Sequence, residues 1–197
     1  MFQLLDTLGV NRVSVMALSY GGFVAFRMAS TQPDRLGQVI LSNTPGLGMQ
    51  EADYEALLDT FSVTHPRDVF LPSQPDGVKE LMAIAWHRPP PLPRFAMRDA
   101  FRNLYQDQMV EKTELLDELV SHLGQQSGHL VNYEDVRGPV LIVWGEHDRV
   151  FPPHLAHRLK SDLGSKATLK MIHRTAHAPN LERPRRFNRI VLQFLEQ

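Results

Sequence analysis

The pattern of hydrophobic and polar residues divides the chain into three parts. Residues 12–18 and 36–43 form short runs that are apolar on both faces, and residues 20–30 between them place apolar side chains at helical spacing. Runs of this kind are typical of buried parallel strands. The first part therefore predicts a strand, a helix and a second strand joined as one unit of a parallel sheet.

The middle part, residues 46–137, shows almost no strand pattern and predicts helices separated by prolines. From Pro139 onward the alternation of strand and helix returns and ends in an amphipathic helix. The sequence thus predicts an α/β fold whose core consists of residues 1–45 and 138–197. A helical domain at 46–137 interrupts this core.

Composition narrows the expected partners. The 21 basic and 22 acidic residues give a formal net charge of -1, so there is no electrostatic reason to expect nucleic acid or an anionic membrane. The chain has no cysteine, which excludes disulfides and cysteine nucleophiles and suits a reducing cytosol. The first ten residues lack a signal-peptide pattern, and no apolar run reaches the roughly 18 residues of a membrane-spanning helix. We expect a cytoplasmic protein without stable membrane insertion that acts on a small molecule.

Ser19 lies where the first predicted strand must turn into the first predicted helix. Ligands bind beyond the carboxyl ends of parallel strands, and a sharp turn there needs small neighbours such as Ala17 and Gly21. The first backbone N–H groups of the helix, beginning with that of Tyr20, point toward negative charge that develops beside the serine. Ser19 is therefore a candidate nucleophile, and the Tyr20 N–H is a candidate oxyanion donor. A helix cap is the alternative role that this short pattern leaves open.

A serine nucleophile needs a histidine base and a carboxylate that orients the histidine. Asp148 follows the third predicted strand, and His177 lies in the loop after the fourth. Both are candidates, because the carboxyl ends of parallel strands meet at one edge of the sheet. Glu146 is an alternative acid, although its spacing from the strand end favours Asp148.

His173 and His177 are four residues apart, a spacing that suits a metal site on a helix. Here the pair spans a predicted strand end and a loop. We therefore expect no metal site, and no pattern in the sequence indicates a cofactor.

Three segments together resemble the α/β-hydrolase fold family. "ALSYGG" is similar to its nucleophile elbow, "WGEHDRVFP" to its acid loop and "AHAPNLERP" to its histidine loop, and they occur in the family's order of Ser, Asp, His. The resemblance implies that Ser19 is the nucleophile, His177 the general base and then acid, and Asp148 the orienting carboxylate. It also implies that residues 46–137 are the helical cap that such enzymes insert.

The sequence departs from the family pattern in three places. Ala17 and Ala176 stand where glycine is usual, and both are small. The family also places several strands before the elbow strand, with a second oxyanion donor in a loop among them, whereas this chain begins just before the elbow strand. The resemblance therefore implies a mostly parallel sheet with helices on both faces that lacks its N-terminal part.

A serine nucleophile disfavours the branches of the family that use aspartate. The resemblance then implies a serine hydrolase that cleaves a carboxylic ester of a small or medium apolar acyl group, such as a monoacylglycerol-like lipid, through an acyl-enzyme. A carbon–carbon bond hydrolase with the same triad is the alternative among enzymes. A non-catalytic, receptor-like protein that only binds its ligand is the alternative outside enzymes.

Overall fold

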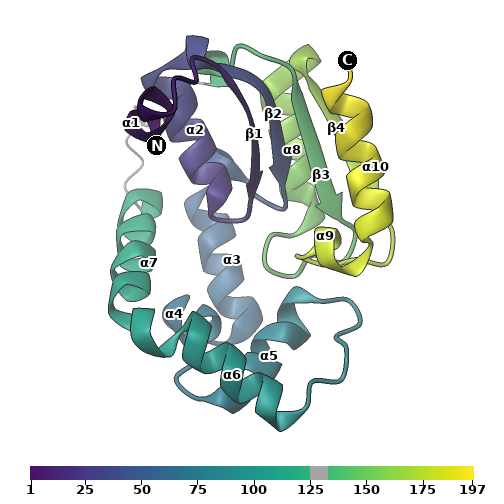
Figure 1. The fold of residues 1–197 in the computed structure, drawn as a ribbon. Coiled ribbons are helices and arrows are strands. Elements are labelled where there is room, and N and C mark those ends of the chain that lie inside the picture. The colour runs from purple at the N-terminus through teal and green to yellow at the C-terminus, as the bar shows by residue number, and fades with distance from the viewer. Residues whose placement is uncertain (125–132) are drawn as a thin grey trace. The chain divides into compact units, whose positions relative to one another are not determined.

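The computed structural model describes residues 1–124 and 133–197. Within these residues, four strands form one parallel sheet in the order β1, β2, β3, β4 (Figure 1). They are β1 (Val13–Leu18), β2 (Leu36–Ser42), β3 (Val140–Gly145) and β4 (Ala167–Ile172). The predicted α/β fold with a parallel sheet is confirmed.

The helices fall into two groups. Those in the same part of the chain as the sheet are α1 (Phe2–Thr7), α2 (Gly21–Thr31), α8 (Pro153–Leu163), α9 (Pro179–Glu182) and α10 (Pro184–Leu195). The middle of the chain forms α3 (Glu51–Phe61), α4 (Arg67–Phe70), α5 (Pro75–Ala85), α6 (Arg94–Leu104) and α7 (Met109–Gly124). Short 3-10 helices lie at Pro33–Arg35, Gly46–Gly48, Gln106–Gln108, Tyr133–Asp135 and Gly164–Lys166.

Contacts divide the chain into two compact units. The sheet unit comprises Met1–Gly48 and Gly128–Gln197, and the helical unit comprises Met49–Ser127. None of the helices within the described ranges is both long enough and apolar enough to cross a membrane.

Helices cover both faces of the sheet, as predicted. α10 packs on one face, where Phe187, Val191 and Phe194 form a cluster with buried apolar residues of β2, β3 and β4. α2 contacts β1 and β2, whereas α8 contacts β3 and β4. Figure 1 shows α10 in front of the sheet and α8 behind it. Burial of apolar side chains on both faces of the central strands is the main force that holds this unit together.

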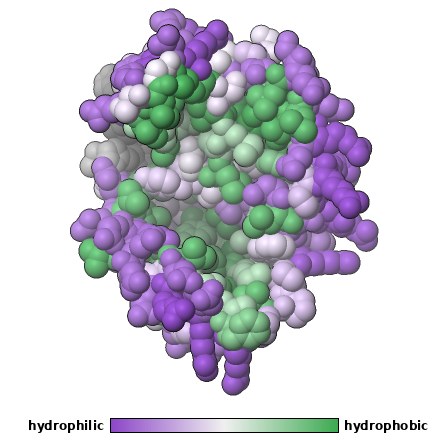
Figure 2. Space-filling model, in the orientation of Figure 1, coloured by the Kyte–Doolittle hydropathy of each residue, from purple (hydrophilic) through white to green (hydrophobic). Residues whose placement is uncertain are grey.

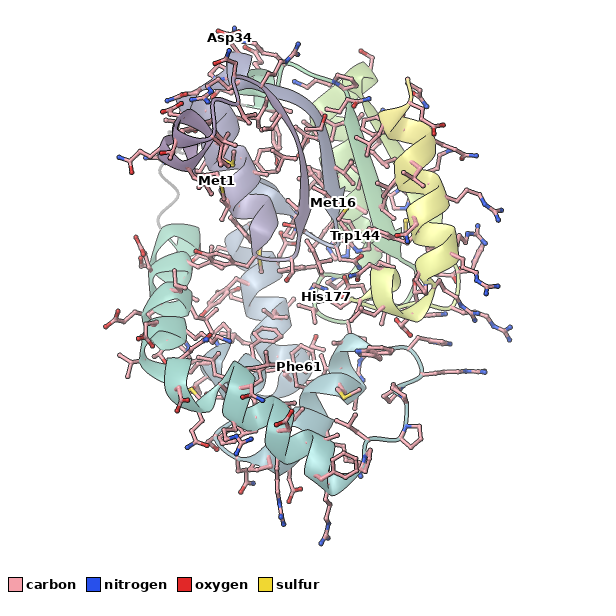
Figure 3. The ribbon with its side chains drawn as sticks, viewed as in Figure 1. Met1, Met16, Asp34, Phe61, Trp144 and His177 are labelled. Carbon is pink, nitrogen blue, oxygen red and sulfur yellow. The ribbon has the colours of Figure 1, made fainter. Side chains whose placement is uncertain are left out.

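The apolar run of strand β1 predicts burial on both faces, but the strand is partly exposed. It lies at the edge of the sheet, with β2 as its strand neighbour, and Met16 and Leu18 are 59% and 39% exposed. Figure 3 shows Met16 on this edge strand, and green apolar areas interrupt the surface of the sheet unit in the upper part of Figure 2. The prediction was wrong because the composition of a run does not reveal how many strands lie beside it.

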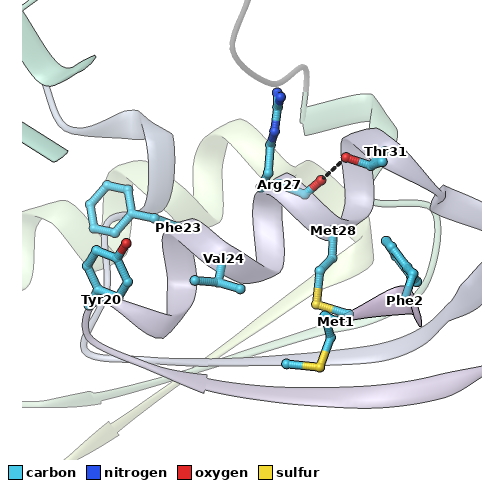
Figure 4. Close-up of a pocket in the computed structure, with 8 residues that line it drawn as sticks. All are labelled: Met1, Phe2, Tyr20, Phe23, Val24, Arg27, Met28 and Thr31. Atoms are coloured by element: carbon cyan, nitrogen blue, oxygen red, sulfur yellow. Dashed lines mark hydrogen bonds between the residues drawn. The ribbon is translucent and has the colours of Figure 1, made fainter. Parts of the chain in front are cut away.

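An open groove of about 360 Å³ runs along α2 in the sheet unit (Figure 4). Most of its lining is apolar, and the lining residues are Met1, Phe2, Tyr20, Phe23, Val24, Arg27, Met28 and Thr31. The groove and the edge strand β1 together expose apolar surface to water on this side of the unit.

We expect the isolated 197-residue chain to self-associate through the β1 edge. An unpaired apolar strand edge invites pairing with another chain, and β1 contains no proline or lysine that would prevent it, whereas β4 at the opposite edge carries Lys170. Size-exclusion chromatography at rising concentration should show oligomers, and Met16→Lys should shift the protein toward monomer. A wild-type chain that stays monomeric throughout would contradict this prediction.

Candidate active site

Ser19 occupies a tight turn between β1 and α2. Its backbone φ is 52°, a left-handed conformation that residues other than glycine seldom adopt. Two backbone hydrogen bonds hold the turn, since the Ser19 N–H donates to Ser42 O at 3.0 Å and the Gly22 N–H donates to Ser19 O at 2.9 Å. These hydrogen bonds keep Ser19 in its strained backbone conformation. The residue lies at the carboxyl end of the sheet, as the sequence predicts.

Small residues allow α2 to start this close to the sheet. A Cβ added at Gly21 would lie 3.7 Å from the Cβ of Ala17, which is an ordinary contact distance. A Cβ at Gly22, in contrast, would collide with the side chain of Thr44. Thr44 is fully buried and follows β2 by two positions. Gly22, which the sequence reasoning did not single out, is thus the position where steric space demands glycine.

Asp148 lies in the loop after β3 and is 3% exposed. Its Oδ1 accepts hydrogen bonds from the backbone N–H groups of Val150 at 2.9 Å and Phe151 at 3.0 Å. Its Oδ2 lies 2.9 Å from Nδ1 of His177. Because each carboxylate oxygen has a fixed partner, the side chain has one orientation, in which Oδ2 faces the imidazole of His177.

His177 joins Asp148 to Ser19. Its Nε2 lies 2.8 Å from Ser19 Oγ, its Nδ1 faces the carboxylate, and the Phe151 ring packs edge-on at 5.5 Å between ring centroids. The hydrogen-bond network assigns the proton to Nδ1, which leaves the Nε2 lone pair to accept the Ser19 hydroxyl proton. Figure 3 shows His177 at the end of the sheet that carries these loops. The structure thus brings the three predicted side chains together.

Glu146 and His173, which the sequence left as alternatives, form a separate pair. Glu146 Oε2 lies 2.9 Å from His173 Nδ1, and both side chains are more than a third exposed, at 40% and 68%. This hydrogen bond holds the pKa of Glu146 below its ordinary value. His173 and His177 therefore have different carboxylate partners. Among residues 1–124 and 133–197, no cluster of three or more histidine or acidic side chains is placed to hold a metal ion.

The backbone N–H of Tyr20 precedes the first turn of α2. The N–H groups of Gly22 and Phe23 already donate to Ser19 O and Tyr20 O. The Tyr20 N–H and the positive end of the helix dipole favour negative charge beside Ser19. The role of Tyr20 as an oxyanion donor stays a prediction.

A buried asparagine that the sequence reasoning missed completes the site. Asn43 directly follows β2 and is fully buried, and its Nδ2 donates to Asp148 Oδ2 at 2.6 Å. The available signal was a polar residue at the carboxyl end of the strand that precedes the helical segment. That signal gains meaning only when β2 is known to lie beside β3.

Gly145 ends β3 and lies against the loop that leads to His177. A Cβ at this position would collide with the backbone oxygen of Ala176. The acid and histidine loops therefore approach closely only because residue 145 has no side chain. Hydrogen bonds of Glu146 N–H to Ile172 O at 3.2 Å and His147 N–H to Thr175 O at 2.9 Å hold the two loops together.

We expect Gly145→Ala to destabilise the protein by about 1–3 kcal/mol, because the added methyl group must push backbone apart. Gly37→Ala on β2 is the matched control, since the nearest atom to an added Cβ there is 3.5 Å away. Its effect should stay within about 0.5 kcal/mol. Urea denaturation measures both variants, and equal stability of the two would rule out the close approach as the reason for Gly145.

Comparison with known proteins places this chain in a family. The model of the alpha/beta hydrolase fold family matches residues 1–184. The chain belongs to the alpha/beta hydrolase fold family. This membership confirms the family resemblance, and the four-stranded sheet agrees with the expected lack of part of the family's sheet.

Curated alpha/beta hydrolase relatives align along nearly the whole chain. A 2-hydroxy-6-oxononadienedioate/2-hydroxy-6-oxononatrienedioate hydrolase of Burkholderia vietnamiensis is 25% identical over an alignment of 209 positions, gaps included, that covers 98% of this chain and 65% of that protein. Hydrolase 1 of the same description from Dechloromonas aromatica is 27% identical, with the same two coverages. The chain therefore spans about 65% of the length of these relatives.

Solved alpha/beta hydrolase structures share the fold at lower identity. A protein from Acinetobacter baumannii described as a candidate lipase superposes with a TM-score of 0.83 at 18% identity, covering 98% of this chain and 64% of that one. A meta-cleavage product hydrolase gives a TM-score of 0.71 at 19% identity, with coverages of 99% and 69%. Carboxylesterase CesB of Bacillus subtilis gives 0.66 at 16% identity, with coverages of 99% and 64%.

Proposed function

We propose that this chain is a serine hydrolase that cleaves small-molecule esters through an acyl-enzyme, with Ser19 as the nucleophile. The observation that carries the proposal is the continuous hydrogen-bond chain from Ser19 Oγ through His177 to Asp148, with distances of 2.8 Å and 2.9 Å. A hydroxyl becomes a strong nucleophile when a base takes its proton, and this base is held by a buried carboxylate.

In acylation, Ser19 Oγ forms a bond to the ester carbonyl carbon while its proton passes to Nε2 of His177. Asp148 stabilises the imidazolium that forms, because its Oδ2 faces Nδ1. The carbonyl electron pair moves onto oxygen, where the Tyr20 N–H donates to it. The intermediate then collapses, the bond to the alcohol oxygen breaks, and His177 returns the proton to that oxygen.

In deacylation, a water molecule attacks the carbonyl carbon of the acyl-enzyme and gives one proton to His177. The bond to Ser19 Oγ breaks, and the same proton returns to the serine. Ester and water thus become acid and alcohol, and no reactant other than water is needed.

Cleavage of a carbon–carbon bond is the second candidate. The observation that favours it is the name of the curated relatives, which are 2-hydroxy-6-oxononadienedioate/2-hydroxy-6-oxononatrienedioate hydrolases matched over 98% of this chain. The same serine, histidine and aspartate serve that reaction. The difference lies in the leaving group, which is a carbon atom that must receive a proton.

Fluorophosphonate labelling of the intact chain tests the proposal, because the probe bonds covalently to an activated serine. Turnover of p-nitrophenyl butyrate and of a 2-hydroxy-6-oxo-dienoate, each measured against a Ser19→Ala background, then separates the two substrate classes. We expect labelling and ester turnover. Turnover of the dienoate alone would favour the second candidate, and a chain with neither labelling nor turnover would contradict the proposed hydrolase.

A further inference from the structure

Asn43 stands in an unusual backbone position for a fully buried polar residue. Its φ is 48°, and its N–H donates to Val143 O at 3.1 Å, so the residue leaves β2 while still bonded to β3. Asparagine tolerates this left-handed conformation better than most residues. Glycine would tolerate it better still, so the backbone alone does not explain an amide side chain here.

The side chain of Asn43 bonds to both loops of the candidate active site. Its Nδ2 donates to Asp148 Oδ2 at 2.6 Å and to the backbone oxygen of Ala176, the residue before His177, at 3.2 Å. Its Oδ1 accepts from the Ser42 hydroxyl at 3.3 Å. Both amide protons are thus bonded. The amide connects Asn43 to two residues that lie 105 and 133 positions further along the chain.

We propose that Asn43 is a positioning residue that holds the carboxylate of Asp148 and the loop of His177 in register with Ser19. This inference rests on the proposed function for its catalytic meaning. Removal of the amide would leave Ala176 O without that donor and would leave His177 Nδ1 as the side-chain partner of Asp148 Oδ2. A buried acceptor that loses its partner costs free energy, so the loop would move to find another.

Electrostatics gives Asn43 a second effect. Its side-chain Nδ2 and the imidazole Nδ1 both bond to Oδ2 of Asp148, so they share one acceptor atom. A donor on that oxygen stabilises negative charge there and weakens the pull of the carboxylate on the imidazolium. Without Asn43 the imidazolium would be favoured, and the neutral histidine that catalysis needs would form only at higher pH.

Other titratable groups lie on the two loops and on α9. Glu182 Oε1 accepts the N–H of Ala176 at 2.6 Å. Glu146, His147 and His173 lie at more exposed positions of the acid and histidine loops. Glu146→Gln therefore serves as the control, since it removes a negative charge from the acid loop and should move the titration of His177 in the opposite direction, and less.

The experiment compares wild type, Asn43→Gly, Asn43→Ala and Glu146→Gln in the intact 197-residue chain. Asn43→Gly removes the amide and relieves the left-handed backbone, whereas Asn43→Ala removes the amide and keeps a Cβ, so agreement between them separates hydrogen bonding from strain. Thermal unfolding confirms that each variant is folded. NMR of ¹³C-labelled histidine rings follows the titration of His177, which is identified as the signal missing from His177→Asn.

We expect the midpoint pH of the His177 titration to lie above that of wild type in both Asn43 variants. If the proposed function holds, the acid limb of kcat/KM moves with it, and kcat falls by about tenfold to a hundredfold while KM changes little. A midpoint unchanged from wild type in both variants would overturn the role of Asn43. A shifted midpoint in a protein that reacts with neither probe nor substrate would support the positioning role of Asn43 and would refute the proposed hydrolase activity.

Discussion

Ser19→Ala should reduce fluorophosphonate labelling to background and lower turnover by about 10³-fold to 10⁶-fold, the range seen when a serine nucleophile is removed. The reason is geometric. Ser19 Oγ is the hydroxyl that lies 2.8 Å from Nε2 of His177, and its backbone strain places it at the open end of the sheet. Alanine keeps the Cβ and the same backbone, so the variant should fold as the wild type does.

Ser14→Ala is the matched control for this substitution. Ser14 lies on β1, the strand that leads to Ser19, and its hydroxyl makes one exposed contact with Gln38 at 3.4 Å. Its loss should leave labelling and turnover unchanged. Labelling that persists in Ser19→Ala and disappears in another serine variant would show that the nucleophile has been assigned to the wrong residue.

The hydrophobic pattern predicts much of the sheet, because a central strand that is buried on both faces is apolar at most of its positions. β3 is apolar at every position from Val140 to Trp144 and is buried throughout, as its run predicts. The same reasoning fails for β1, whose run is also apolar. Burial of a strand depends on neighbours as well as composition, and a linear sequence does not contain the order of strands in a sheet.

The three loops of the site were predictable because each carries its polar residue within five positions of the end of an apolar strand. Ser19 follows β1, Asp148 follows β3, and His177 follows β4. A parallel sheet brings such carboxyl ends to one edge, so position in the local pattern was enough to group them. Their catalytic roles remain a prediction until the substitutions are measured.

Asn43 shows why the remainder of the site was not predictable. It lies at the end of a predicted strand, yet its meaning depends on partners more than a hundred positions away, at Asp148 and Ala176. Those contacts exist because β2 lies between β1 and β3, which sequence spacing does not reveal. The steric need for Gly22 likewise arises from Thr44, a residue of the next strand's loop.

Asp148→Asn should lower kcat by about ten-thousandfold, the loss found when an orienting aspartate of a serine triad becomes an amide. The structure favours one direction for the new amide. Oδ1 of Asp148 accepts the backbone N–H groups of Val150 and Phe151, which cannot turn away, so the oxygen of an asparagine would be held there. The side-chain amide of Asn43, which donates to Oδ2, can turn its own oxygen toward the new NH₂ group. The NH₂ group of the new asparagine would then face His177 and favour the tautomer with a proton on Nε2. That tautomer cannot accept the proton of Ser19.

Glu146→Gln is the control for the acid, because Glu146 bonds to His173 and is exposed to solvent. We expect its kcat to stay within about threefold of wild type, as for other surface substitutions away from reacting groups. Steady-state kinetics on the preferred substrate measures both variants. Losses of equal size would mean that Asp148 does not orient His177 during turnover, since only a carboxylate bonded to Nδ1 fixes the tautomer. A large loss in Asp148→Asn alone would assign the acid to Asp148, whose carboxylate lies beside the buried amide of Asn43.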